Sequence, residues 1–305
     1  MKVTCWGVRG SIPTPGYETA RYGGNTLCVE VALPECGRTI VIDAGSGIRR
    51  LGHDLMARPG RAPRVALDLF LTHTHLDHIL GLPFFQPLYQ PDTQVSLYGP
   101  VTSSEDGLKK VIGGQLSYQY FPVRQAELAA DIRYVDLAEG VSDIGDGIRV
   151  SATYLNHPLL CMGYRLEYRG KILCTAFDTE PFQNIFSTVP SDPGYDESMA
   201  REGGQAARDA NLRIQEFARG ADLVIHDGQF TAAEYAAGRA GWGHSSIEHA
   251  VAVAEACGAR RLALVHHDPM RTDPELDRLA EVYGGLRPGS GLRVCFAHEG
   301  LSVTL

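Results

Sequence analysis

The segment HTHLDH at positions 73–78 carries four side chains of the types that bind metal ions, and it directly follows an apolar run. At an extended strand end, side chains at positions i and i+2 point the same way, so His73 and His75 can hold one metal together. If the chain then turns into a helix, Asp77 and His78 face a neighbouring point. We therefore expect this segment to supply ligands to two adjacent ions, in preference to a polar loop that is rich in histidine by chance.

Three further residues of ligand type stand at the ends of predicted strands. His157 follows one strand, Asp178 follows another, and His266 directly ends a third. Taken singly, a strand-end aspartate is usually a turn or cap residue, and a lone histidine is usually an ordinary polar side chain. Together they recur at the same kind of place, which is how loops on a rigid sheet build a functional site.

The order His-x-His-x-Asp-His, then His, Asp and His, resembles that of the metallo-β-lactamase superfamily. The resemblance extends over nearly the whole chain, because Asp43 in the run VIDAG stands where the family keeps a structural aspartate. It implies that Asp43 orients the ligand loop without binding metal. It also implies two ligand sets that share one carboxylate, which would offset the repulsion between two cations. These sets are His73, His75, His157 and Asp178 for one metal, and Asp77, His78, Asp178 and His266 for the other.

The adjacent residues His266 and His267 require a choice. In the family a histidine directly ends the last core strand, which is His266 here. A side chain one position further along a strand points the opposite way. We therefore expect His267 to make a hydrogen bond at the rim of the site.

The runs HDG at 226–228 and GHSS at 243–246 are similar to those of the ribonuclease Z and related phosphodiesterase branch. The resemblance implies that His244 acts as a general acid. Asp227, or His226 beside it, would orient His244, although the family more often has glutamate where Asp227 stands. A purely structural His226 is the alternative.

Two Gly-rich segments near the start, GVRGSIP at 7–13 and YGGNT at 22–26, also resemble this branch. They are similar to its small-molecule members, including cyclic-nucleotide phosphodiesterases and the cyclic-phosphate enzyme of phosphonate metabolism. Such loops can bring backbone N–H groups close to an anion. Ser11 and Asn25 are candidates to donate hydrogen bonds to phosphate, and simple turn residues are the equal alternative.

The expected reaction is hydrolysis of a phosphodiester. Two divalent cations lower the pKa of a bound water, and Asp77 would hold or accept its proton while binding metal. His244 would protonate the alkoxide leaving group. Zinc best fits the His-rich ligand set, and manganese or iron would accept the same nitrogen and oxygen ligands.

The surrounding elements are those of a layered α/β protein. Short strands separated by Gly- and Pro-rich turns come first, and strands alternating with helices come later. This order predicts two mixed β-sheets stacked face to face with helices outside, the four-layer αββα sandwich of the metallo-β-lactamase fold, in one domain over residues 1–305. The expected strands cover residues 3–6, 26–33, 39–42, 65–71, 94–98, 147–154, 163–168, 171–175, 222–225, 261–265, 293–296 and 301–305. The expected helices cover 48–57, a stretch from 205 onward, 245–257 and 274–283.

The composition fits a folded soluble protein, with 305 residues, 44% hydrophobic and 21% charged side chains, and a net charge of −8. The seven cysteines are scattered and form no Cys-x-x-Cys pair. Reduced thiols and a cytoplasmic location are the expectation. The sequence has no apolar run of transmembrane length, so no membrane association is expected.

The segment 182–204 is the least patterned stretch and is expected to form a lid or mobile loop. It is acidic, with a single arginine against four carboxylates. Ribonuclease Z enzymes, as the resemblance implies, grip tRNA with a basic projecting arm. The expected partner is therefore a small-molecule phosphodiester such as a cyclic nucleotide, with no extended nucleic-acid surface and a possible homodimer. Aromatic side chains are candidates to stack on a base, or else to pack: Phe182, Tyr195, Trp242 and Tyr120.

Three other functions remain open at this point. A thioesterase, lactonase or β-lactam hydrolase would use the same metals but depend less on a protonated His244. A tRNA 3′-processing endonuclease is disfavoured by the acidic segment. A non-catalytic, metal-stabilised binding protein is disfavoured because every ligand position is filled.

Overall fold

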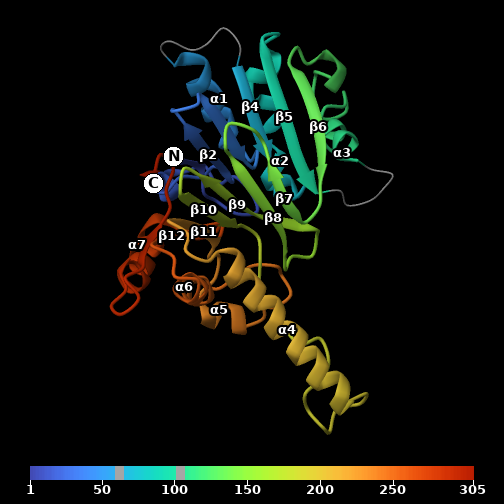
Figure 1. Cartoon of the computed structure of the whole chain (residues 1–305), viewed down its shortest axis with the longest axis vertical. Helices are drawn as coiled ribbons and strands as arrows, with labels where there is room; N and C mark the ends of the chain where they lie inside the picture. Colours follow the sequence, from blue (N-terminus) through green and yellow to red (C-terminus); the bar gives the residue numbers. More distant parts are fainter. Residues whose placement is uncertain (59–64, 101–106) are drawn as a thin grey trace.

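Two β-sheets face each other in the middle of the molecule, and helices lie outside them (Figure 1). The computed structural model describes residues 1–58, 65–100 and 107–305. The first sheet runs in the order β15 (Ser302–Thr304), β1 (Lys2–Gly7), β2 (Cys28–Leu33), β3 (Arg38–Ile42), β4 (Val65–Phe70), β5 (Thr93–Pro100) and β6 (Asp131–Leu137). The second runs in the order β13 (Gly285–Leu286), β14 (Arg293–Phe296), β12 (Arg261–Val265), β11 (Leu223–Asp227), β10 (Lys171–Ala176), β9 (Cys161–Tyr168), β8 (Arg149–Leu155) and β7 (Gly140–Asp143). Both sheets are mixed, so the predicted fold is confirmed.

The helices connect the strands and cover the outer faces of the sheets. They are α1 (Ile48–Ala57), α2 (Leu76–Ile79), α3 (Leu108–Gln115), α4 (Glu197–Phe217), α5 (Ala232–Ala236), α6 (Ile247–Ala256) and α7 (Asp273–Tyr283). Short 3₁₀ turns lie at η1 (Tyr17–Thr19), η2 (Leu82–Phe84), η3 (Gln86–Tyr89) and η4 (Gln125–Glu127). None of the described helices has the length and apolar character needed to cross a bilayer.

The alternation of apolar and polar side chains along the strands gives each sheet an inner apolar face. Val29, Val31 and Phe70 of the first sheet pack against Tyr164 and Ile225 of the second in one buried cluster. On the outer faces, apolar side chains recur every three or four residues along the helices, which is the spacing of one helical face. Separate buried clusters thus join α1 to β4 and β5, and α6 to β11 and β12.

Parallel strands end together at one rim of the sandwich. β3 and β4 are parallel neighbours in the first sheet, and β10, β11 and β12 are parallel neighbours in the second. The two sheets are tied here by hydrogen bonds from the backbone N–H of Met162 to the carbonyl of Thr72 (2.9 Å) and from the Tyr164 hydroxyl to the carbonyl of Leu71 (2.5 Å). Because the loops that follow these strands begin from fixed positions, they can hold side chains in a defined geometry.

The segment 182–204 differs from its predicted form. Residues 197–204 are the first two turns of α4, a 21-residue helix that extends away from the body of the protein (Figure 1). The Asp196 side chain caps the helix by accepting a hydrogen bond from the N–H of Met199 (2.9 Å). Gly203 and Gly204 suggested a loop because glycine is a poor helix former, but the cap and the length of the helix outweigh that preference. Three described strands, β6, β7 and β13, are absent from the predicted set.

Candidate metal centre

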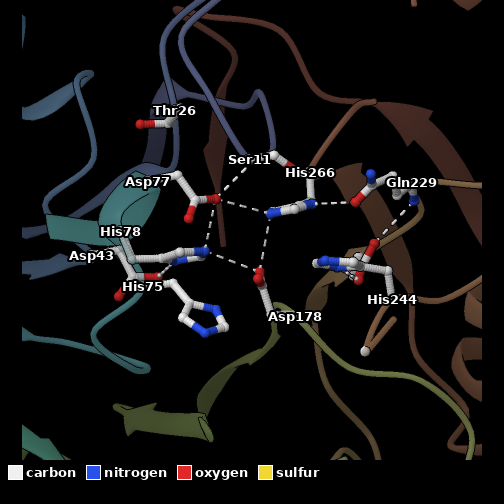
Figure 2. A network of polar contacts seen from close by, with 12 residues as sticks. Ser11, Thr26, Asp43, His75, Asp77, His78, Asp178, Gln229, His244 and His266 are labelled. Carbon is white, nitrogen blue, oxygen red and sulfur yellow. Dashed lines mark hydrogen bonds and ion pairs between the residues drawn. The ribbon is translucent and has the colours of Figure 1, made fainter. Parts of the chain in front are cut away.

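The seven predicted ligands meet at the rim where the parallel strands end. Figure 2 shows His75, Asp77, His78, Asp178 and His266 from this set. Their ligating atoms form two groups, each with its atoms within 4.8 Å of one another. The first group is His73, His75, His157 and Asp178, and the second is Asp77, His78, Asp178 and His266. Loops after strands of both sheets contribute, so the site forms only when the sandwich is assembled.

Asp178 belongs to both groups and directs one oxygen to each. Its Oδ2 lies 3.6 Å from Nε2 of His73 and 3.9 Å from Nε2 of His157. Its Oδ1 lies 3.1 Å from Nε2 of His78 and 3.3 Å from Nε2 of His266. This is the arrangement that a carboxylate bridging two cations requires.

Several buried ligand atoms make no hydrogen bond among the described residues, although they lie 3.1–3.6 Å from an atom of another candidate ligand. They are Nε2 of His73, Nε2 of His78 and Oδ1 of Asp178. A buried polar atom left without a partner costs free energy that a bound cation would recover. Together with the nitrogen and oxygen donor set, these atoms fit divalent metal ions, as the fold and the His/Asp cluster imply.

Burial and charge set the protonation of these histidines. Burial holds the pKa of His73 well below its ordinary value, which leaves the imidazole neutral and able to bind metal. Burial also opposes the charge on His266, but the carboxylates of Asp178 and Asp77 outweigh it and raise the pKa of His266 to about 9. A metal ion bound between these carboxylates would take the place of that proton.

Hydrogen bonds on the far side of three of these imidazoles fix their orientation. Nδ1 of His78 lies 2.7 Å from Oδ2 of Asp43, Nδ1 of His157 lies 2.9 Å from the carbonyl of Gly243, and Nδ1 of His266 lies 2.9 Å from Oε1 of Gln229. A proton on each Nδ1 leaves Nε2 free to bind metal. Gly243 and Gln229 were not predicted, because neither residue type is distinctive in a sequence.

Asp43 lies beside the ligand groups, where it holds His78 and also contacts Thr72. It is completely buried, and it accepts hydrogen bonds from the N–H (2.7 Å) and hydroxyl (2.8 Å) of Thr72 as well as holding His78. Asp43, Asp178 and His266 all have backbone φ angles between 27° and 60°. Non-glycine residues rarely adopt this region, and such strain is characteristic of functional sites.

His244 lies beside the ligand groups and is held by Asp227. Its Nδ1 is 2.9 Å from Oδ2 of Asp227, and its ring stacks on that of His266 with 4.5 Å between centroids. Asp227 is fully buried and also accepts hydrogen bonds from the N–H groups of Gln229 (2.9 Å) and Ser245 (3.2 Å). Asp227 is therefore the partner of His244, whereas His226 contacts the carbonyl of Asp227 (2.7 Å) and not His244.

His267 points away from the site, in agreement with the choice of His266. Its Nε2 lies 2.8 Å from the carbonyl of Ala297, and burial lowers its pKa to about 3. The neutral ring packs edge-on against Tyr22. Its position is structural.

The two candidates for phosphate binding, Ser11 and Asn25, make contacts within the protein. The backbone N–H of Ser11 donates to Oδ2 of Asp77 (2.9 Å), so this loop positions a candidate metal ligand. The side-chain N–H groups of Asn25 donate to Glu299 (3.0 Å), and its oxygen accepts a hydrogen bond from Ser46 (2.9 Å). These contacts favour a structural role for Asn25, and a phosphate contact by Ser11 stays a prediction.

Glu180 links the loop of Asp178 to the loop of His244, which the sequence did not suggest. Its Oε2 accepts hydrogen bonds from the hydroxyl of Tyr235 (2.8 Å) and the N–H of Gly241 (2.8 Å). Gly241 lies three residues before His244, in the segment that also presents the carbonyl of Gly243 to His157. Glu180 therefore restrains the segment 238–243.

Replacing Asp43 with asparagine is expected to weaken metal binding at the second ligand group. The variant loses the charged acceptor that fixes His78, and loss of such supporting contacts costs about 10–100-fold in metal affinity. The measurement is competition between the protein and a chromogenic zinc chelator. The matched control is Asp209→Asn on α4, and unchanged affinity in Asp43→Asn would contradict the role given to Asp43.

Replacing Glu180 with alanine is expected to loosen the segment 238–243 without removing metal. Amide hydrogen exchange in this segment should become about tenfold faster or more, because exchange reports local opening. The conservative change Glu180→Gln keeps an acceptor oxygen and should restore most of the protection. Equal exchange in wild type and Glu180→Ala would show that the segment is held by other contacts.

Comparison with known proteins agrees with this geometry. Residues 38–188 match the model of a β-lactamase superfamily domain. Ribonuclease Z of Lactococcus lactis subsp. lactis is 28% identical over 246 residues, covering 71% of this chain and 76% of that protein. Ribonuclease BN of Erwinia tasmaniensis is 27% identical over 275 residues, covering 79% of this chain and 82% of that protein.

These relatives contradict the expectation of a small-molecule substrate with no nucleic-acid surface. Proteins named as ribonucleases match this chain over most of its length. The expectation depended on the acidity of the segment 182–204, part of which is helix α4. The charge of one projecting element does not decide what binds at the rim of the sheets.

A solved structure shares the whole architecture. The metallo-β-lactamase fold protein YhfI from Bacillus subtilis superposes with a TM-score of 0.63 at 18% identity, over 99% of this chain and 98% of that one. The fold, the matched domain and the convergent His/Asp cluster lead to one assignment. The chain belongs to the metallo-β-lactamase superfamily and is a hydrolase of its ribonuclease Z-like branch.

Proposed function

We propose that this protein is a dinuclear metal-dependent phosphodiester hydrolase and that RNA is among its substrates. The observation that carries the proposal is the His244–Asp227 pair, with 2.9 Å between Nδ1 and Oδ2, placed directly against the two ligand groups. The relatives named ribonuclease Z and ribonuclease BN support RNA as the substrate class.

The need for His244 follows from the leaving group. When bound, two divalent cations supply an activated water and offset the negative charge of the phosphoryl oxygens. The alkoxide released from a phosphodiester is a poor leaving group unless it is protonated. His244 can donate that proton from Nε2, because its Nδ1 is occupied by Asp227. A thiolate or a stabilised amine leaves more easily, so a thioesterase or β-lactamase would have less use for such a pair.

The other residues of the site have positioning roles in this proposal. Asp77 receives the N–H of Ser11 (2.9 Å) and lies 3.3 Å from His266, so its carboxylate is held in place beside the point where water would be activated. Asp227 keeps the imidazole of His244 in one orientation through the contact between its Oδ2 and Nδ1 of His244. Zinc is the metal that we propose, because nitrogen ligands predominate.

A direct test replaces His244 with glutamine in the zinc-loaded protein. We expect turnover of a dinucleotide, which has an alkoxide leaving group, to fall about 10²–10⁴-fold, because this is the usual contribution of a positioned acid. Turnover of bis(p-nitrophenyl) phosphate should fall much less, because p-nitrophenolate leaves without a proton. Zinc content, measured by mass spectrometry, should stay at the wild-type value.

His53→Gln on the exposed face of α1 is the matched control. Loss of zinc from His244→Gln would identify His244 as a ligand, in the third group that it forms with Asp227 and His266, and would overturn its role as the acid. A substrate panel of single-stranded RNA, cyclic nucleotides, a thioester and a β-lactam completes the test. Faster hydrolysis of the thioester or β-lactam than of any phosphodiester would contradict the proposed activity.

A further inference from the structure

An apolar groove opens beside the segment that carries the metal ligands. It is formed by α2, η2, α3 and the turn after α3, and it encloses about 500 Å³. Leu76, Phe84 and Tyr120 line it and are 67%, 55% and 79% exposed. Large apolar side chains exposed together in one depression usually mark a binding site.

The groove is continuous with the candidate metal centre. Leu76 lies between the ligands His75 and Asp77, and Leu80 follows it one turn later on the same face of α2. Asp77 and His78 lie on the adjoining faces of this short helix. A group attached to a phosphate at the metal centre would therefore have to extend only across the width of α2, about 10 Å, to enter the groove.

The lining of the groove is suited to a flat ring with polar edges. Phe84 and Phe121 meet edge to face with centroids 5.3 Å apart, and Tyr120 adds a third aromatic side chain. Gln115 also lines the groove, and its buried Nε2 has no hydrogen-bond partner among the described residues. An unpaired buried donor is costly, and a ligand with an acceptor on its edge would satisfy it.

The position of His244 decides which part of the substrate reaches the groove. In Figure 2, His75 and His244 lie on either side of Asp178. The proposed acid must face the leaving oxygen, so the leaving group lies on the side of His244. The groove lies next to His75 and Leu76, on the opposite side from His244. It therefore faces the part of the substrate that keeps the phosphate after cleavage.

We propose that this groove binds the unstacked base of the nucleotide that retains the phosphate after cleavage. The inference depends on the proposed phosphodiester activity and adds a specificity site to it. Aromatic side chains are the usual platform for single-stranded bases, and stacking on them tolerates different bases because every base presents a π-face. The amide of Gln115 would contact an acceptor on the edge of the base.

The test uses two chromogenic esters that share a leaving group. Adenosine 5′-(p-nitrophenyl phosphate) carries the base on the retained side, and ribose 5-(p-nitrophenyl phosphate) lacks it. Because p-nitrophenolate leaves from both, the ratio of their kcat/KM values reports only the contribution of the base. We expect the base to raise kcat/KM about tenfold or more in the wild type.

Phe84→Ala and Tyr120→Ala should each reduce this ratio to about threefold or less, mainly through KM, because each removes part of the stacking surface. Two variants are used so that misfolding of one does not decide the result. Tyr118→Ala is the matched control, because Tyr118 is similarly exposed but its hydroxyl contacts Glu127 (3.2 Å) and it does not line the groove. The control should keep the wild-type ratio.

Equal kcat/KM for the two esters in the wild type, or an unchanged ratio in both groove variants, would overturn the proposal. A shift of the sedimentation coefficient in Phe84→Ala with the ratio unchanged would instead assign the groove to contact between copies of the chain. If neither ester is hydrolysed, the phosphodiester activity fails, and the groove is then tested by calorimetric binding of AMP against ribose 5-phosphate. Equal affinities there would exclude a base site.

Discussion

A buried carboxylate shared by two groups of histidines is the constraint on which the rest of the site depends. Asp178 is 2% exposed, and its two oxygens face different imidazoles. A charge in such a place is tolerated only when it is paired or binds metal. With Asp77 and Asp43 it places three carboxylates among the histidines, an arrangement that fits divalent cations. Much of the surrounding structure serves to hold this arrangement.

The double sheet provides the rigidity that this arrangement needs. The candidate ligands follow the ends of strands in both sheets, and each ligand group has members from both. A shift of one sheet against the other would therefore separate the members of each group. Hydrogen bonds between Met162 and Thr72 and between Tyr164 and Leu71 oppose that shift directly beside the ligands. This packing also holds Asp43, Asp178 and His266 in the left-handed region of the backbone, which non-glycine residues adopt infrequently.

The sequence predicted the fold class and the convergence of the seven ligands, because both leave strong local signals. The run at positions 73–78 is rich in ligand residues, and His266 and Asp178 each follow a buried strand. The sequence left both Asp227 and His226 as possible partners of His244, because a sequence pattern does not show which of two neighbouring side chains faces His244. Gln229, Gly243 and Glu180 act through contacts between distant loops, and their residue types carry no signal of that kind. The sequence did not predict the first turns of helix α4, because Gly203 and Gly204 favour a loop. The N-cap at Asp196 has the larger effect in the structure.

Three proposed functions lie side by side along one rim. A metal centre would activate water, His244 would protonate the leaving group on one side, and an apolar groove on the other side would provide a surface for the retained nucleotide. The central claim is that two cations share Asp178. Crystals of the zinc-loaded protein measured at the zinc absorption edge test it most directly. We predict two anomalous peaks, each about 2.0–2.2 Å from Asp178 and from the nitrogen atoms of its own ligand group. A single peak, or a peak held by Asp227 and His244 in place of Asp178, would contradict the account.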